Sequence, residues 1–528
     1  MTSPTTATPP APPVPFRAPR AVLTALLITM LLAALDQTIV STALPTITSD
    51  LGGLAELSWV VTAYLLTSTA TTPLWGKLSD LYGRKVILQI AVSTFVVGSV
   101  LAGASQDMAQ LIATRALQGV GGGGIMVLIL AAVADLIPAR ERGRYTGLFF
   151  AVFGFASVIG PLLGGLFTQH LSWRWIFYIN VPLGAVALVV IGIAMHLPPK
   201  RSKPRIDWLG SALLLVGVTL LLLVTVWGGQ QYDWTSATIL GLAAGGVVAL
   251  VLFVLQELHH PEPILPMRLF RNGTMRVATA VMFILGFAMF GAIVYLSIYT
   301  QVVRGASPTE AGLQLLPLML GLMITSIGSG RLVARTGRYR VLPIVGTGLA
   351  ALGIYLMSFL HPDTPYVLFA LYALILGLGL GFVMQVLTIA AQNSVSPHDI
   401  GIATGATTFA RSIGASFGTA AFGAVYAARL QHEITASLGP AAAEQLSKGD
   451  GAATASVQNL LALPSDLYHA LVAAFSHALD TTFLLAVPVV LVAFVITWFL
   501  KEHPLRTAPR DSESLNDDAI TPLPVPSE

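Results

Sequence analysis

Apolar runs of about 20 residues alternate with short polar segments along most of the chain. A run of this length is what an α-helix needs to cross the hydrocarbon core of a bilayer. Helices satisfy their own backbone hydrogen bonds in lipid, so these runs predict helices rather than isolated strands. We therefore predict an all-α polytopic membrane protein with fourteen transmembrane helices, over residues 21–44, 57–76, 86–105, 109–137, 144–168, 175–196, 208–227, 236–256, 275–301, 311–333, 341–360, 365–392, 403–427 and 479–500.

The composition supports membrane insertion and excludes cysteine chemistry. Of the 528 residues, 55% are hydrophobic and only 10% are charged, whereas soluble domains carry about 25% charged residues. The absence of cysteine excludes disulfides, thiolate metal sites and cysteine nucleophiles. The ends, 1–19 and 503–528, have the composition of disordered tails. The first apolar run is too long for a signal-peptide core, so we expect it to remain in the membrane.

Basic residues are distributed unevenly over the predicted loops. Of 28 Lys and Arg residues, 22 fall in the tails and alternate loops on one side, four fall on the other, and two lie within spans. Cytoplasmic loops of membrane proteins carry the excess of Lys and Arg. We therefore expect a multi-pass protein of the plasma (inner) membrane with both termini in the cytoplasm.

The sequence contains an internal duplication. GKLSDLYGR at 76–84 returns as GRLVARTGR at 330–338, and residues 142–147 are echoed at 400–405. Internal repeats of this kind are typical of secondary transporters. We expect two six-helix bundles, 20–200 and 261–502, with two inserted helices between them at 201–260. Residues 428–478 are expected to form a long extracellular loop that contains polar and helical stretches.

Asp36 is the one carboxylate well inside a predicted span. Ionisable residues at membrane depth are costly and normally mark a substrate, ion or proton pathway. Arg115 lies at a depth that differs from that of Asp36 by only ~5 Å, at 1.5 Å per helical residue. A change in their separation would change how readily the carboxylate takes up a proton. The alternative is a static ion pair that holds two helices together.

Five segments together resemble the major facilitator superfamily, in particular its fourteen-span drug:proton antiporter branch of multidrug resistance exporters. The resemblance runs through most of residues 20–500. The segments that carry it are LDQTIVSTALP at 35–45, GKLSDLYGRK at 76–85, LIATRALQG at 111–119, GFASVIGPLLGG at 154–165 and WRWIFYINVPLG at 173–184.

The resemblance assigns the 76–85 loop to a conformational latch. It implies a charge network in which Asp80 and Arg84 meet Asp135, and which stabilises one of the two states used for alternating access. The alternative is a basic cytoplasmic loop that only fixes the membrane topology of the chain. In the second copy Ala334 replaces Asp80 while the arginine persists, which fits a latch confined to one half. The latch residues we predict are Gly76, Asp80, Gly83, Arg84, Lys85 and Asp135.

A second implied element is the antiporter motif of the fifth span, which the resemblance links to export. Its small residues also suit ordinary close packing of membrane helices, which is the alternative. The motif residues are Gly154, Gly160, Pro161, Gly164 and Gly165. The run Gly121–Gly124 superficially suggests a phosphate loop, but it lacks the following Lys-Ser/Thr and lies in an apolar stretch. We expect no nucleotide site, no ATP-driven transport, and neither a cofactor nor a metal.

Candidates for a substrate cavity are weaker. Arg411 lies within a predicted span and could contact anionic substrate groups, although we favour a structural role. Aromatic side chains could hold flat cations by cation–π contact, but such residues also face lipid or form interfacial belts. The aromatic candidates are Trp59, Tyr64, Phe290, Tyr295 and Tyr299.

These observations predict a proton-coupled antiporter that exports amphipathic drugs and toxic compounds, lipophilic cations among them, and so confers antibiotic resistance. The alternative is a dedicated exporter of an endogenous antibiotic, lipid or peptide on the same fold. A receptor is disfavoured because no substantial soluble domain is present, and an enzyme because no His/Glu/Asp constellation lies within the spans. We expect a monomer whose partners are a small-molecule substrate, protons and membrane lipids, with no nucleic acid.

Overall fold

The protein is all helical. A computed structural model describes residues 20–51, 57–137, 139–195, 207–229, 231–306, 308–438, 465–502 and 504. The longer helices are α1 (Arg20–Leu51), α2 (Leu57–Tyr82), α3 (Arg84–Ala104), α4 (Met108–Leu136), α5 (Ala139–His170), α7 (Asn180–Ala194), α8 (Trp208–Trp227), α9 (Ala237–His259), α10 (Gly273–Ile298), α12 (Leu316–Thr336), α13 (Val341–Met357), α14 (Tyr366–Asn393), α15 (Ile400–Leu438) and α19 (Ser465–Thr497). Short helical segments are α6 (Trp175–Tyr178), η2 (Met267–Arg271), η3 (Tyr299–Val303), α11 (Pro308–Gln314) and η4 (Pro397–Asp399).

Ten helical stretches in the described ranges are long and apolar enough to cross a membrane, against fourteen predicted spans. A further apolar helix, α13, is only 17 residues long. The remaining three predicted spans coincide with α2, α5 and α15, which are longer but richer in Thr, Ser, Gly and charged residues. Hydropathy alone therefore supports ten of the predicted crossings.

Several helices extend beyond their predicted ends. α1 continues to Leu51, α15 continues to Leu438, and α19 already begins at Ser465. The described flanks of the predicted loop 428–478 are therefore helical and continue α15 and α19; residues 439–464 lie outside the described part. Leu430 and Ile434 belong to the same buried cluster as Leu471 and Phe475, so apolar packing beyond the membrane-length segment explains the extension. The two predicted tails also lie outside the described residues, apart from 504.

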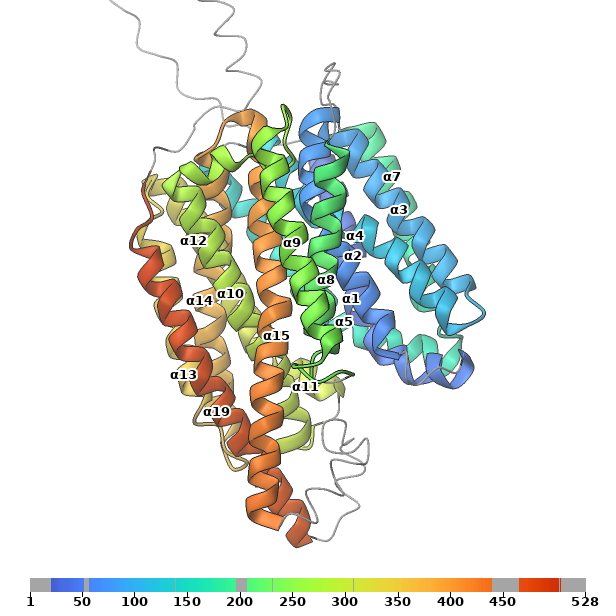
Figure 1. The fold of residues 1–528 in the computed structure, drawn as a ribbon, viewed down its shortest axis with the longest axis vertical. Helices are drawn as coiled ribbons and strands as arrows, with labels where there is room; N and C mark the ends of the chain where they lie inside the picture. The colour runs from blue at the N-terminus through green and yellow to red at the C-terminus, as the bar shows by residue number, and fades with distance from the viewer. Residues whose placement is uncertain are drawn as a thin grey trace, which may run out of the picture.

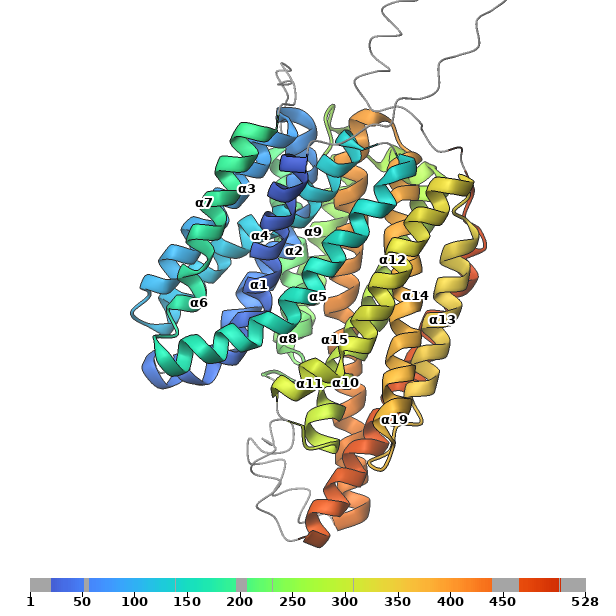
Figure 2. The same ribbon diagram turned by 180° about the vertical axis from the view of Figure 1, so that it is seen from behind.

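The helices form two groups with a pair between them (Figure 1). Helices α1–α7 pack with one another, and so do α10–α19, whereas α8 and α9 pair together and α8 lies against α2 and α15. Between the groups, α2 packs on α15, and on the other side of the molecule α5 packs along α12 (Figure 2). The groups lie close together at the end where α2 meets α3, and they spread apart towards the opposite end. Gly83 joins these two helices, so we call this end the Gly83 end.

Each copy of the duplicated loop has a glycine with positive φ after its first helix. Gly83 follows α2 with φ +94°, and Gly337 follows α12 with φ +70°. Only glycine adopts positive φ without a steric penalty, which explains why both copies retain it at this position. Each turn connects one helix to the next within its own group.

Candidate functional site: a buried carboxylate network and a latch between the helix groups

Asp36 and Arg115 meet in the interior of the first helix group. Arg115 on α4 donates a hydrogen bond from Nη1 to Asp36 Oδ2 on α1 over 2.8 Å. The two side chains are 0% and 1% exposed, so water cannot solvate either charge. A buried ion pair is tolerated only when its remaining donors and acceptors are also satisfied.

Polar side chains on α4 and α7 donate further hydrogen bonds to the Asp36 carboxylate. Gln118 Nε2 on α4 and Asn180 Nδ2 on α7 both donate to Asp36 Oδ1, over 2.8 and 3.2 Å. Each of these amides also donates to Ser99 Oγ on α3, and the Ser99 hydroxyl donates a hydrogen bond to the Phe177 carbonyl. The Asp36 carboxylate thus accepts three hydrogen bonds and joins α1, α4 and α7, and Ser99 extends the network to α3.

Arg115 makes two further hydrogen bonds within the same group. Its Nη1 also donates to Gln118 Oε1 over 2.7 Å, and its Nε donates to the Val60 carbonyl on α2. The guanidinium lies 4.4 Å from the ring centre of Tyr64 and 5.7 Å from that of Phe177. Cation–π contact adds to the stability of the desolvated charge.

Sequence reasoning missed three members of this network, namely Ser99, Gln118 and Asn180. Gln118 follows Arg115 by three positions and therefore lies on the same helix face. Asn180 and Ser99 are polar residues inside otherwise apolar predicted spans. Buried polar groups need hydrogen-bond partners, so polar side chains at membrane depth were the signal that could have found them.

The predicted latch residues lie together at the Gly83 end. Arg84 pairs with Asp80 over 2.6 Å and with Asp135 over 2.7 Å, which joins the ends of α2, α3 and α4. Asp80 additionally accepts hydrogen bonds from the backbone amides of Gly401 and Ile402, over 3.3 and 2.9 Å. Those amides open α15 in the other helix group, where the helix dipole favours a negative charge. The charge network therefore bridges the two groups.

Glycines permit the backbones to approach at this bridge. A Cβ atom on Gly76 would lie 2.6 Å from the Gly401 carbonyl oxygen, and one on Gly401 would lie 2.6 Å from the Asp80 carboxylate. Gly405 lies one turn further along α15, against Pro73 and Gly76 of α2. By contrast, Lys85 donates to the Gly192 carbonyl on α7, within its own group.

A further buried carboxylate fixes the turn that precedes α15. Asp399 in η4 accepts hydrogen bonds from Ser396 Oγ over 2.8 Å and from Arg268 Nη2 over 3.0 Å. Burial alone would raise its pKa, but the hydrogen bonds from His398 and Ser396 and the charge of Arg268 hold the pKa of Asp399 below its ordinary value. Asp399 thus stays charged and helps to place the amides that Asp80 contacts.

The antiporter motif places a glycine against α1 near Asp36. A Cβ atom on Gly160 would lie 2.1 Å from Thr38 Oγ1, and Thr38 donates to the Ala156 carbonyl of α5 over 3.0 Å. Gly164 is buried, whereas a Cβ atom on Gly165 would have no neighbour within 4 Å. Gly154 and Pro161 lie within α5, and their surroundings fall outside the described part.

We expect Gly160→Ala to destabilise the protein, because the methyl group overlaps the Thr38 side chain and forces α1 and α5 apart. Overpacking of this kind typically costs about 1–3 kcal/mol. Gly165→Ala is the matched control, since open space surrounds that position. Thermal unfolding in detergent measures both variants. Equal melting temperatures for the two variants would contradict the close α1–α5 contact.

The predicted cavity residues do not come together. Tyr64 is buried against Arg115, and Tyr299 is buried with its hydroxyl donating to the His361 carbonyl. Tyr295 is buried against Tyr426 of α15, and Trp59 packs edge-on against Trp227 of α8. Arg411 is partly buried on α15, and the side chain of Phe290 lies outside the described part. These positions belong to separate packing contacts in the described residues.

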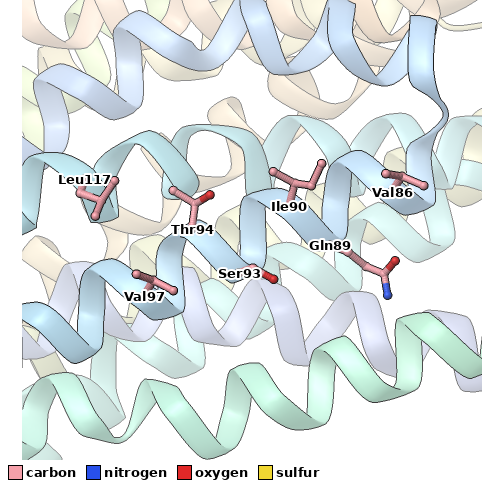
Figure 3. Close-up of a pocket in the computed structure, with 7 residues that line it drawn as sticks. All are labelled: Val86, Gln89, Ile90, Ser93, Thr94, Val97 and Leu117. Carbon is pink, nitrogen blue, oxygen red and sulfur yellow. The ribbon is translucent and has the colours of Figure 1, made fainter.

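A shallow groove lies on the outer face of α3, away from the network. Its volume is about 460 Å³, and its lining side chains project from α3 and α4 in Figure 3. Ile90 and Val97 are exposed there, whereas Ser99 and Gln118 are buried on the opposite side. The lining residues are Val86, Gln89, Ile90, Ser93, Thr94, Val97 and Leu117. This face is an exposed surface distinct from the Asp36 site.

The helical arrangement and motifs are those of a family of membrane transporters. Residues 26–419 match the model of the Major Facilitator Superfamily, and the chain belongs to that superfamily. It is therefore a multi-pass membrane transporter and not an enzyme, and its ligands are small molecules.

Similar proteins include named multidrug transporters. An uncharacterized MFS-type transporter of Mycobacterium tuberculosis is 45% identical over 496 residues, which cover 94% of this chain and 71% of the relative. The multidrug transporter protein MdtP of Bacillus subtilis is 40% identical over 420 residues, covering 79% and 77%. The solved structure of the proton:xylose symporter XylE superposes with a TM-score of 0.60, 14% identity and coverage of 92% and 96%. At that identity the likeness shows the fold alone.

Proposed function

We propose that the protein is a proton-coupled antiporter that exports amphipathic toxic compounds from the cytoplasm or inner leaflet across the plasma membrane. Outward transport is supported by the names of its relatives, among them a multidrug transporter and an efflux pump. The proposal includes the fourteen-span arrangement, with bundles at 20–200 and 261–502 and inserted helices at 201–260. It places both termini and the Gly83 end in the cytoplasm.

The buried Asp36 network is the observation that carries the proposal. Its carboxylate, when charged, accepts hydrogen bonds from Arg115, Gln118 and Asn180. Protonation would remove the charge that balances Arg115 and would turn one acceptor into a donor. The hydrogen bonds across α1, α4 and α7 would then have to rearrange. One proton therefore changes the packing of the helix group that holds it, which is what coupling to a conformational cycle requires.

The latch supplies the second element of the cycle. We propose that Asp80, bound to the amides of Gly401 and Ile402, holds the cytoplasmic end closed in an outward-facing state. Release of this contact would separate α2 from α15 and open the cytoplasmic side. Gly160 and the rest of the antiporter motif would keep α5 close to α1 near Asp36 during this motion.

Dye transport in everted membrane vesicles tests the proposal. The lumen of such vesicles corresponds to the cell exterior, so an acid lumen should drive dye uptake. We expect uptake to follow an imposed pH gradient without ATP and to stop when an ionophore collapses that gradient. Uptake that requires ATP and ignores the pH gradient would contradict proton coupling.

We expect Gln118→Leu to reduce proton-driven transport at least tenfold. The change removes a donor to Asp36 Oδ1 and an acceptor of Arg115, and a lost hydrogen bond to a charged group costs about 1.5–3 kcal/mol. Gln110→Leu is the matched control, because Gln110 lies exposed at the start of the same helix. Initial rates of dye uptake at equal expression measure both. Equal rates for the two variants would argue against a role of Gln118 in proton coupling.

A further inference from the structure

Arg411 is a cation at membrane depth without a partner among the described residues. It follows the start of α15 at Ile400 by eleven positions, which corresponds to about 16 Å along the helix. The described part of the chain shows neither a hydrogen bond nor an ion pair to its guanidinium. The sequence contains no carboxylate well inside a predicted span other than Asp36, and Asp36 is already bound by Arg115. An uncompensated charge at this depth is by default a functional site.

The contacts of α15 define the face on which Arg411 lies. Gly401 and Gly405 pack on α2, whereas Gly414 and Gly418 pack on carbonyl groups of α10. With 3.6 residues per turn, position 411 falls on the edge of the α10 contact that is nearer to α2. Because α2 and α10 belong to different helix groups, this sector of α15 faces the boundary between the groups.

Ala410, which precedes Arg411, shows which side of the α10–α15 contact faces outwards. Ala410 lines a surface groove of about 540 Å³ together with Phe283 and Ile284 of α10, and Phe283 is exposed. Ala410 therefore lies on the outer side of the α10–α15 contact. Since successive helical positions are separated by 100°, Arg411 is on the inner side of that contact.

The charges at membrane depth are unequal between the two helix groups. In the first group, Asp36 and Arg115 neutralise each other. In the second, Arg411 is a net positive charge. A site with that balance favours a ligand that brings a negative group, and it disfavours a ligand that brings only a positive one.

We propose that Arg411 binds the carboxylate of the transported compound, so that the substrates are carboxylate-bearing amphiphiles rather than simple lipophilic cations. This inference rests on the proposed export function and names the substrate class of that site. A guanidinium presents a planar fork of donors that matches a carboxylate with two parallel hydrogen bonds. The apolar remainder of the substrate would lie against the apolar helix surfaces between the two groups.

The proposal has a consequence for energetics. Export of one monovalent anion in exchange for one incoming proton moves two positive charge equivalents inward. Export of a monovalent cation for one proton moves none. With a carboxylate substrate of net negative charge, a membrane potential alone should therefore accelerate transport.

A matched pair of dyes tests the assignment by binding. Rhodamine 110 carries a free carboxylate, and rhodamine 123 is its methyl ester. Fluorescence anisotropy with the full chain in lipid nanodiscs gives the ratio of the two affinities for each variant. We expect the wild type to bind the carboxylate at least tenfold more tightly than the ester. Arg411→Gln should abolish this preference, and Arg411→Lys should keep part of it, because lysine retains the charge without the fork.

Controls separate this inference from the proposed function. Arg331→Gln removes an exposed charge from α12 and should leave the preference intact. Because the readout is a ratio within each variant, general loss of folded protein does not change it. Absence of a carboxylate preference in the wild type, or an equal loss of both affinities in Arg411→Gln, would overturn the inference. Proton coupling is judged independently, by the effect of the pH gradient on vesicle transport.

Discussion

Asp36→Asn is expected to lower proton-driven export at least a hundredfold while leaving the amount of inserted protein unchanged. Asparagine has almost the same shape as aspartate but cannot take up a proton at neutral pH. It also leaves the buried Arg115 without a countercharge. Its amide oxygen can still accept from Arg115 or Gln118, so the helices α1 and α4 retain part of their contact.

Efflux of a fluorescent substrate from energised cells, at expression matched by immunoblotting, measures the effect. Asp36→Glu should retain partial activity because it keeps the titrating group. Asp363→Asn removes an exposed carboxylate from the loop between α13 and α14 and should behave as the wild type. Full active transport by Asp36→Asn would contradict the assignment of this residue as the proton carrier.

The second large effect is expected from Asp80→Asn, which should open the Gly83 end. The two amides of Gly401 and Ile402 bond different carboxylate oxygens, so the asparagine turns an NH2 donor towards one of them, and it loses the charge that pairs with Arg84. Losing a charge-assisted contact of this kind costs about 2 kcal/mol, which corresponds to a roughly 30-fold shift in the ratio of closed to open molecules.

Because the chain has no cysteine, reporter cysteines can be introduced without first removing native ones. Spin labels at Tyr82 and His398, both exposed at the Gly83 end, report the separation of the two helix groups by double electron–electron resonance. Glu502→Gln is the matched control. Glu502 accepts from the amide of Tyr339 within one group, so its neutralisation should leave the separation unchanged. A distance distribution in Asp80→Asn identical to that of the control would rule out the latch.

The positions of Asp36 and Arg115 at similar depth in the membrane could be predicted from the sequence, because so few charged residues lie in the apolar runs. Asp36 is the one carboxylate well inside a predicted span, and the rise of an α-helix brings Arg115 to nearly the same depth. The structure places the two within hydrogen-bonding distance. The positive φ angles of Gly83 and Gly337 follow in the same way, because a repeated glycine between two helices indicates a conformation that other residues avoid.

Other features depend on partners that a sequence pattern does not show. The hydrogen-bond donors to Asp80 in the second helix group are backbone amides, and any residue except proline supplies such a donor. The duplication indicated positions 400–405 as a repeat but gave no reason to join them to Asp80. Likewise, the aromatic candidates were chosen by residue type, and the structure distributes Tyr64, Tyr295 and Tyr299 among unrelated contacts. Rotational position around each helix decides such contacts, and it depends on tertiary packing.

Simultaneous measurement of substrate and proton movement tests whether the protein is a proton antiporter. The purified protein would be reconstituted into liposomes that contain a pH-sensitive dye and are loaded with the transported substrate. We expect substrate that leaves down its gradient to be accompanied by proton movement in the opposite direction, and we expect Asp36→Asn to uncouple the two fluxes. Substrate movement in the wild type without any opposing proton flux would contradict proton antiport.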